Sequence, residues 1–263
     1  MVDVPLHYES VGSGDPVVLL HAGIADASMW DDQVPAFAER YRVIRFDAQG
    51  FGRSPAAPSP QPRAGDVYDL LRALDVARAH VVGVSMGGAA AIDFAVEHPD
   101  MVGTLIPVAA GLSGYTASDP WLEEREALEE AAIERGDVDA AVEVNLRVWL
   151  AGPARRYQDM DPTLSDRVAR LTRHALERGA ERKPTPQIDP PAAGRLGEVT
   201  APTLVIVGDR ETQLVIALAD LLAQRIRGAR KRVFADTAHM LNMERPAEFN
   251  AVVLEFLAAH PLE

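Results

Sequence analysis

Short runs of Val, Ile and Leu alternate with helical patterns through the first 110 residues of this 263-residue chain. Apolar runs of four or five residues are typical of parallel strands that are covered on both faces. The helical patterns between them supply the crossover connections that parallel strands require. We therefore predict an α/β fold with an open, mostly parallel sheet. The strands predicted here are Val17–Leu20, Val43–Phe46, Val81–Val84 and Leu105–Val108, and the helices are Met29–Arg40, Gly65–Leu74 and Met86–Glu97.

The same pattern continues at both ends of the chain. Leu6–Ser10, together with Val11, weakly indicates an earlier edge strand. Strands resume at Leu204–Val207 and Lys231–Phe234, and Pro246–His260 is typical of a closing helix. We expect a sheet of about eight strands in all.

Strand signals stop between residues 118 and 180, where three helical patterns follow one another. Asp119, Asp137 and Asp161 each stand at an N-cap position, and two of them precede a proline at the first helical position. Glycines follow each pattern, as they do at helix ends. The predicted helices run from these caps to Arg135, Leu150 and Gly179.

Three consecutive helices inside a β/α chain indicate an insertion. We expect residues 1–115 and 195–263 to form the α/β core, and residues 116–194 to form a helical cap. Five prolines between Lys183 and Pro202 predict a stiff return linker from the cap to the core.

Composition excludes several classes of partner. Lys and Arg number 26 against 39 Asp and Glu, a net charge of −13 that would repel nucleic acid and acidic membranes. There is no cysteine, which rules out disulfides, thiolate metal sites and a cysteine nucleophile. The first residues do not resemble a signal peptide, and no apolar run reaches the ~18 residues of a membrane-spanning helix. We expect a soluble, cytoplasmic protein.

The segment Gly83–Gly88, GVSMGG, matches the pattern G-x-S-x-G. On the order of one chain in ten of this size would carry such a match by chance. Here, however, it lies between a predicted strand and a predicted helix, the context that a nucleophile elbow requires. Glycines two residues before and two after the serine avoid clashes with its strained turn. We predict that Ser85 is a nucleophile; the alternative is a turn of small residues.

A serine hydroxyl needs a base to take its proton, and the chain has seven histidines. His239 lies in a short loop after the last predicted strand and before the last helix. Loops at the carboxyl ends of parallel strands gather over one crevice, and Ser85 also follows such a strand end. We predict that His239 and Ser85 meet there; the alternative is a histidine on a surface loop.

These features resemble the α/β-hydrolase superfamily over essentially the whole chain, including its order of serine, acid and histidine. Single-domain members with a helical cap between the sixth and seventh strands are most similar. They include enol-lactone hydrolases, small carboxylesterases, cofactor-free haloperoxidase-like esterases and carbon–carbon bond hydrolases. The matching segments are Leu19–Gly23, Asp47–Ser54, the elbow, Pro202–Asp209 and the late His239.

The acid departs from the pattern of these families, which usually place Asp three residues after the glycine that ends the seventh strand. Gly208 is followed by Asp209, Arg210 and Glu211, so Glu211 holds that position. Glutamate orients an imidazole as aspartate does, although its extra methylene changes its reach. We favour Glu211 as the acid, with Asp209 as the alternative and a solvated loop charge as a third reading.

The resemblance also implies an oxyanion hole made of backbone N–H groups, which must be aimed at the developing charge. Met86 follows the nucleophile at a helix N-terminus and supplies one donor. Gly23 supplies the second, within a turn where Ala22 replaces the usual glycine. We expect His21 to orient its loop rather than act as a base. The Asp47–Ser54 segment is a structural turn in this family.

We predict hydrolysis of a small carboxylic ester or lactone through an acyl-serine intermediate, with no cofactor and no metal. The alternatives are a carbon–carbon bond hydrolase, lyase or perhydrolase that uses the same triad, or a ligand-binding protein without catalysis. The partner is a small molecule, and the sequence does not specify an oligomeric state. On the cap, the candidates to line the pocket are Trp121, Trp149 and Leu150, although packing is the commoner role of such residues. The candidates to receive a substrate carboxylate are Arg147, Arg155 and Arg156, although exposure to solvent is commoner for arginine.

Overall fold

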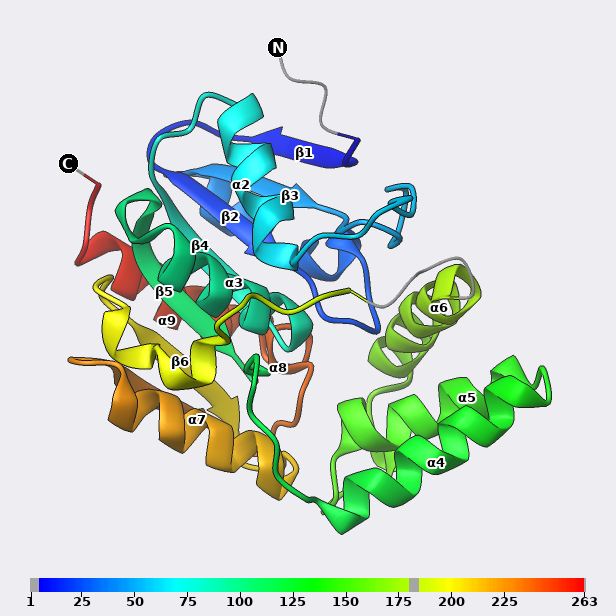
Figure 1. Ribbon diagram of the computed structural model, residues 1–263. Coiled ribbons are helices and arrows are strands. Elements are labelled where there is room, and N and C mark those ends of the chain that lie inside the picture. The colour runs from blue at the N-terminus through cyan, green and yellow to red at the C-terminus, as the bar shows by residue number, and fades with distance from the viewer. Residues whose placement is uncertain (1–4, 180–184, 263) are drawn as a thin grey trace.

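The computed structural model describes residues 5–179 and 185–262, and its centre is a twisted sheet (Figure 1). The strand order is β1-β3-β2-β4-β5-β6-β7, with β1 antiparallel to β3 and the other pairs parallel. The open, mostly parallel sheet is confirmed, with seven strands in the part of the chain described where about eight were expected. The strands are β1 (Tyr8–Val11), β2 (Pro16–Leu20), β3 (Arg42–Phe46), β4 (Ala79–Val84), β5 (Val102–Val108), β6 (Leu204–Gly208) and β7 (Arg230–Phe234).

Side chains that alternate along the central strands divide the core into two layers. Val18 and Leu20 of β2 belong to the layer beneath α2, α3 and α7, whereas Val17 and Leu19 belong to the layer beneath α1 and α9. Both faces of the sheet are therefore covered, as the continuous apolar strands predicted. The core helices are α1 (Val34–Ala38), α2 (Arg63–Ala73), α3 (Met86–Glu97), α7 (Gln213–Arg225), α8 (Leu241–Glu244) and α9 (Pro246–Ala258).

The helix predicted over Met29–Arg40 is interrupted. A short 3₁₀ helix, Ala27–Trp30, begins where the Asp26 carboxylate accepts a hydrogen bond from Ser28 N–H at 2.9 Å. Helix α1 then starts with Pro35 in its first turn. A proline ring is tolerated there but clashes with a preceding helical turn, so it separates the two short helices.

Three helices follow β5 and lie beyond the carboxyl ends of the central strands (Figure 1): α4 (Pro120–Glu134), α5 (Val138–Asn145) and α6 (Pro162–Gly179). The predicted caps are present, because the side chains of Asp119, Asp137 and Asp161 accept hydrogen bonds from N–H groups three residues later. The second helix was expected to reach Leu150 as α-helix. It changes instead into a π-helix, Leu146–Ala151, which ends at Gly152 with a positive φ of 72°.

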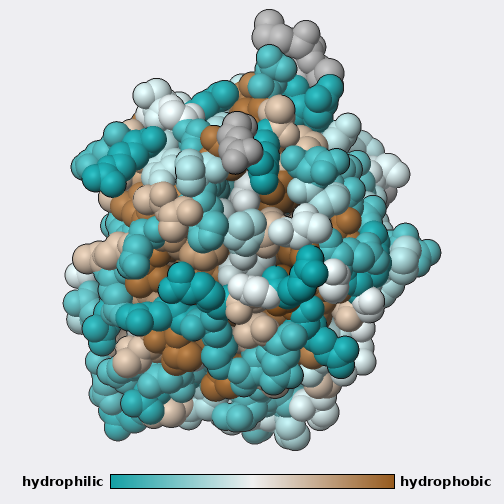
Figure 2. All heavy atoms as spheres, turned by 90° about the vertical axis from the view of Figure 1, so that its left-hand side faces the viewer, coloured by the Kyte–Doolittle hydropathy of each residue, from teal (hydrophilic) through white to brown (hydrophobic). Residues whose placement is uncertain are grey.

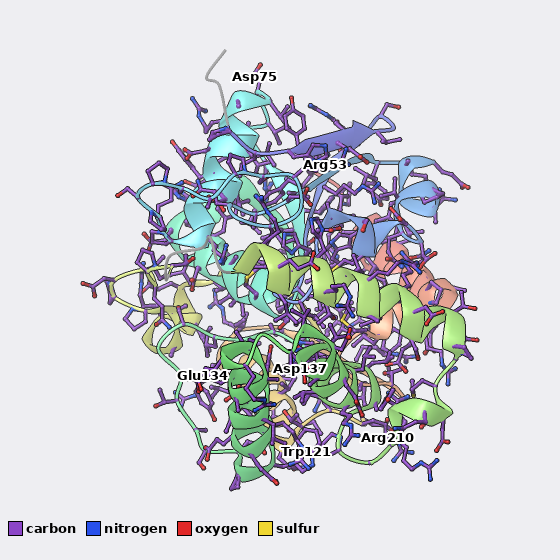
Figure 3. The ribbon with its side chains drawn as sticks, turned by 90° about the vertical axis from the view of Figure 1, so that its right-hand side faces the viewer. Arg53, Asp75, Trp121, Glu134, Asp137 and Arg210 are labelled. Carbon is purple, nitrogen blue, oxygen red and sulfur yellow. The ribbon has the colours of Figure 1, made fainter. Side chains whose placement is uncertain are left out.

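Helix α6 crosses in front of the sheet, with α4 and α5 below it in the view of Figure 3. The chain returns to the core through short 3₁₀ helices at Ala192–Gly194 and Leu196–Glu198. The first two residues of the predicted return linker, Lys183 and Pro184, lie outside the described residues. From residue 185 onward the linker contains no α-helix and no strand until β6.

On the face opposite these helices, hydrophobic side chains form separate patches among hydrophilic ones (Figure 2). Within residues 5–179 and 185–262, no helix has the length and apolar character needed to cross a membrane.

Candidate active site

Ser85 occupies a sharp turn between β4 and α3, with φ of 56° and ψ of −114°. A positive φ is uncommon for a residue that carries a Cβ atom, so the surrounding structure must hold this turn. Ser85 N–H donates to Val108 O at 2.9 Å, and Ser85 O accepts from Ala89 N–H at 2.9 Å. The turn is therefore fixed between the end of β5 and the first turn of α3.

The flanking glycines are required by close backbone contacts. A Cβ atom at Gly83 would lie 2.2 Å from Gly87 O, and one at Gly87 would lie 2.4 Å from Leu20 O. Both distances are far shorter than any real contact of a Cβ atom, and the opposing atoms belong to the backbone. Any larger residue at these positions would push α3 away from the strands and displace the serine.

His239 and Glu211 form a hydrogen-bonded pair beside the ends of β7 and β6. Nδ1 of His239 lies 2.6 Å from Oε1 of Glu211, and both side chains are buried. An ionised carboxylate only accepts hydrogen bonds, so Nδ1 carries the proton and Nε2 is left as an acceptor. Oε2 of Glu211 accepts from Thr212 N–H at 3.2 Å, which holds the carboxylate in place.

Asp209, the alternative acid, has another contact. Its Oδ1 accepts from Asp236 N–H at 2.7 Å, and the side chain is 38% exposed. It thereby ties the turn after β6 to the turn after β7. Of the two acids considered from the sequence, the structure places Glu211 against the histidine and Asp209 at the surface.

Ser85 and His239 lie at the carboxyl ends of parallel strands β4 and β7 of one sheet. Ser85 follows β4, His239 follows β7, and β5 and β6 stand between these two strands. Within the described chain no hydrogen bond joins the two side chains. Hydrogen bonds between a nucleophile and its base are in general often long before substrate binds and tighten in the complex.

Gly23 and Met86, the expected oxyanion donors, are neighbours in space. A Cβ atom at Gly23 would lie 3.6 Å from Met86 Cβ and 3.7 Å from Met86 Sδ, which are ordinary contacts. Met86 is the first residue of α3, so its N–H points out of the helix N-terminus. The two residues that the resemblance implied are therefore neighbours, and Met86 directly follows Ser85 in the chain.

His21 fastens the Gly23 loop to the rest of the core. Its Nδ1 lies 2.8 Å from Ala22 O, and its Nε2 lies 3.0 Å from Ala48 N. The first nitrogen must donate and the second must accept, which fixes the neutral tautomer. Burial lowers the pKa of His21, in agreement with this state. The imidazole has no free nitrogen to act as a base, as expected for a residue that orients its loop.

The Asp47–Ser54 segment is a hydrogen-bonded turn. Asp47 Oδ1 accepts from Ala27 N–H at 2.8 Å, and Oδ2 accepts from Arg53 N–H at 2.9 Å. Ser54 Oγ donates to Asp47 O at 2.6 Å. Both carboxylate oxygens are thus used to hold backbone, which agrees with the structural role expected for this segment.

Trp149 is the cap residue in contact with the histidine. Its ring centroid lies 4.4 Å from that of His239, with 45° between the planes. Trp149 stands in the π-helix, a distortion that often accompanies functional sites. Leu150 is fully buried in the core, and Trp121 lies under the Arg125 guanidinium at 4.3 Å. Of the three apolar candidates on the cap, Trp149 is the one placed at this site.

The three arginines proposed as receptors for a substrate carboxylate already have carboxylate partners. Arg147 pairs with Glu143 and Arg156 pairs with Asp159, both at the surface of the cap. Arg155 forms a partly buried pair with Glu244 at 2.8 Å. None of these three side chains is free to bind a substrate anion without giving up its partner.

Sequence reasoning missed a half-buried charge beside the oxyanion loops. Arg63 lines a cavity of about 290 Å³ together with Met86, donates to Thr185 Oγ1 at 3.0 Å, and lies over the Phe51 ring. It forms no ion pair with any carboxylate in the described residues, and burial lowers its pKa. The signal in the sequence was its place at the start of α2, where the helix dipole disfavours a cation.

A larger cavity, of about 490 Å³, lies within the cap between α4, α5 and residues 152–158. Trp121 and Arg125 line it, and Ser85, Glu211 and His239 do not. The described part of the chain contains no group of three His, Cys, Asp or Glu side chains arranged to hold a metal ion.

The sequence profile of the alpha/beta hydrolase fold matches residues 15–246. A 2-hydroxy-6-oxononadienedioate/2-hydroxy-6-oxononatrienedioate hydrolase of Paraburkholderia xenovorans (strain LB400) is 30% identical, over 97% of this chain and 91% of that protein. The crystal structure of the enol-lactonase from Burkholderia xenovorans LB400 matches with a TM-score of 0.76 and 26% identity, over 96% of both chains. Est816, an N-acyl homoserine lactone degrading enzyme, matches with a TM-score of 0.73 and 28% identity, over 96% of both chains. This chain belongs to the alpha/beta hydrolase fold family.

Proposed function

We propose that the protein is a serine hydrolase that cleaves a small carboxylic ester or lactone through an acyl-serine intermediate. The observation that carries this proposal is the buried Glu211–His239 hydrogen bond of 2.6 Å. It lies at the carboxyl ends of the parallel strands, where Ser85 also lies. In a serine hydrolase, a carboxylate that fixes the tautomer of a histidine enables this histidine to take the proton of the serine hydroxyl group.

The residues have distinct roles in the proposed reaction. His239 Nε2 takes the proton of Ser85 Oγ as this oxygen attacks the substrate carbonyl carbon. The N–H groups of Gly23 and Met86 stabilise the negative charge that develops on the carbonyl oxygen. His239 then gives the proton to the leaving alcohol, and in the second half of the reaction it activates the water that releases the acid. Glu211 stabilises the imidazolium throughout.

We further propose that residues 116–194 act as a cap that selects the substrate. Trp149 brings this segment into contact with His239, so the cap reaches the reacting groups directly. The side chain of Arg63 provides a cation that lines the same cavity as Met86 and forms no ion pair within the described residues, and Asp66 is the carboxylate that acts on it from nearby. Arg63 would favour substrates that carry a carboxylate near the reacting carbonyl group.

A second candidate is hydrolysis of a carbon–carbon bond by the same residues. The curated relatives include 2-hydroxy-6-oxononadienedioate/2-hydroxy-6-oxononatrienedioate and 2-hydroxy-6-oxo-6-phenylhexa-2,4-dienoate hydrolases at 29–30% identity. In that reaction the proton goes to a carbon atom of the leaving group, whose electron pair must be delocalised. The substrate class therefore distinguishes the two candidates, although the nucleophile and base are common to both.

The test combines a phosphonate probe with a panel of substrates. Labelling of Ser85, located by mass spectrometry and absent in Ser85→Ala, would support a live nucleophile. The panel contains simple esters, lactones and vinylogous diketones, each with and without a carboxylate. Turnover of esters or lactones supports the first candidate, and turnover of diketones alone supports the second. Labelling without turnover of any substrate would argue against both, and absence of labelling would favour a ligand-binding protein.

A further inference from the structure

Arg155 makes contacts with both the cap and the histidine loop. Its Nε donates to Ala151 O at 2.8 Å, and its Nη2 donates to Leu150 O at 2.8 Å. These carbonyl groups belong to the last residues of the π-helix, directly after Trp149. From the same guanidinium, Nη1 donates to Asp236 O at 2.8 Å, in the loop that leads to His239.

Glu244 completes the connection on the core side. Its two carboxylate oxygens accept from Arg155 Nη1 at 2.8 Å and from Nη2 at 3.2 Å, a two-pronged contact. Oε1 also accepts from the N–H of Ala238 at 2.9 Å, next to His239. The side chain of Glu244 is only 6% exposed and that of Arg155 16%. Two-pronged pairs shielded from water restrict geometry far more than single contacts at the surface.

The Arg155–Glu244 pair therefore connects the π-helix with the loop before His239, the two segments whose rings are in contact at the site. Arg155 holds the end of the π-helix, which carries Trp149, and Glu244 holds the N–H of Ala238, which precedes His239. The rings of Trp149 and His239 lie 4.4 Å apart between these two attachments. Movement of the π-helix relative to the histidine loop would require at least one of these hydrogen bonds to break.

We propose that Arg155 and Glu244 are positioning residues for catalysis, which lock the cap onto the loop of the base and keep His239 aligned with Ser85. The proposal rests on the proposed function of the Ser85–His239 pair and identifies how that pair is held. Neither residue touches the reacting atoms. Misplacement of a reacting group by about 1 Å can cost on the order of 100-fold in rate, so a lock of this kind affects catalysis directly.

The test is the rate at which a phosphonate probe labels Ser85 in the double variant Arg155→Met/Glu244→Gln. This change removes both partly buried charges together, and the glutamine oxygen can still accept from Ala238 N–H. Because labelling needs a correctly placed base, we expect the second-order rate constant to fall roughly 10- to 100-fold. Labelling should still reach one group per chain. The matched control is Arg232→Met/Glu248→Gln, which removes an exposed pair between β7 and α9 and should label at the wild-type rate.

The completeness of labelling separates positioning from folding. A variant that labels fewer chains, each at the wild-type rate, has only lost folded protein and would overturn the proposal. A double variant that labels fully at the wild-type rate would overturn it too. If the wild type itself is not labelled, the proposed function fails, and this inference fails with it.

A single variant covers the case in which the double variant does not fold. Arg155→Lys keeps a positive charge beside Glu244, but one ammonium group does not reproduce the planar fork that holds acceptors in three segments. We expect full labelling at a rate constant between those of wild type and the double variant. A wild-type rate constant in Arg155→Lys would contradict the proposed lock.

Discussion

Glu211 Oε1 and His239 Nδ1 lie 2.6 Å apart, and neither side chain is more than 3% exposed to solvent. Burial of an ionised carboxylate is unfavourable unless its oxygens accept hydrogen bonds. Here the donors are the imidazole and the N–H of Thr212, which lies 3.2 Å from Oε2. The side chain of glutamate, one methylene longer than that of aspartate, thus forms a short hydrogen bond with the histidine. We expect this hydrogen bond to depend on both the charge and the length of the acid.

We predict that Glu211→Gln lowers kcat by about 10³- to 10⁴-fold, because the amide neither fixes the histidine tautomer nor stabilises the imidazolium. Asp209→Asn is the matched control. Its Oδ1 still accepts from Asp236 N–H, so kcat should stay near that of wild type and stability should change by no more than about 1 kcal/mol. Steady-state kinetics and thermal melts of both variants check this. An inactive Asp209→Asn beside an active Glu211→Gln would reverse the assignment of the acid.

Glu211→Asp should retain part of the activity. It keeps the charge but draws the carboxylate back by one methylene, which lengthens the contact to His239. We expect kcat between the values of wild type and Glu211→Gln, with KM little changed because the acid does not touch the substrate. Full activity in Glu211→Asp would show that the loop adapts to either length.

Two replacements of Ser85 distinguish the backbone strain at this residue from the catalytic role of its hydroxyl group. Ser85→Ala and Ser85→Gly both remove the hydroxyl, so both should lose roughly 10⁴- to 10⁶-fold in kcat. Only glycine is free of the steric cost of φ at 56° and ψ at −114°. After allowance for the greater chain entropy of glycine, Ser85→Gly should be about 1 kcal/mol more stable than Ser85→Ala. Chemical denaturation measures this difference, and equal stabilities would show that the turn is not strained.

Loss of the base should also destabilise the fold. His239→Ala removes the main hydrogen-bond donor to the buried carboxylate of Glu211, which we expect to cost about 3 kcal/mol of unfolding free energy at neutral pH. The double variant His239→Ala/Glu211→Gln removes the unpaired charge as well and should recover much of that stability while remaining inactive. Denaturation curves of the two variants decide the point. A double variant no more stable than His239→Ala would show that groups other than His239 stabilise the charge of Glu211.

The features that the sequence predicted correctly depend on local signals. An aspartate followed by a proline specifies a helix start through its own side chain, and the cap of α4 lies at Asp119 as expected. The apolar runs gave the strands to within a few residues for a similar reason, because a strand covered on both faces excludes polar side chains. The turn at Ser85 could be recognised because Gly83 and Gly87 are dictated by backbone contacts.

The features that could not be predicted depend on contacts between distant segments. The π-helix interrupts the regular period of α5. No pattern in the sequence of this segment predicts that Trp149 contacts His239, 90 residues later. The Arg155–Glu244 pair spans a similar distance and involves residue types that are common at surfaces. The site of Arg63 is formed from α2 and the return linker, which no local pattern brings together.

The last prediction concerns a buried acid next to Arg63. Asp66 is only 2% exposed, its Oδ1 lacks a hydrogen-bond partner among the described residues, and burial raises its pKa to about 6. The folded state therefore holds a proton that the unfolded state releases near pH 4, and this stabilisation is lost as pH rises through 6. Asp66→Asn has no such loss and keeps an oxygen to accept from Gln49 N–H.

We therefore expect Asp66→Asn to match wild type in stability near pH 4 and to exceed it by about 1–3 kcal/mol at pH 8. Because a single ionisation is removed, the difference should develop between these limits and level off above pH 7. The exposed Asp75, directly after the same helix, gives the control, because it is not among the charges that act on Asp66: Asp75→Asn should leave the pH dependence of stability as in wild type. Unfolding free energies from urea titrations at several pH values measure both. A constant difference between Asp66→Asn and wild type across this range would show that Asp66 keeps the same protonation state when the chain unfolds.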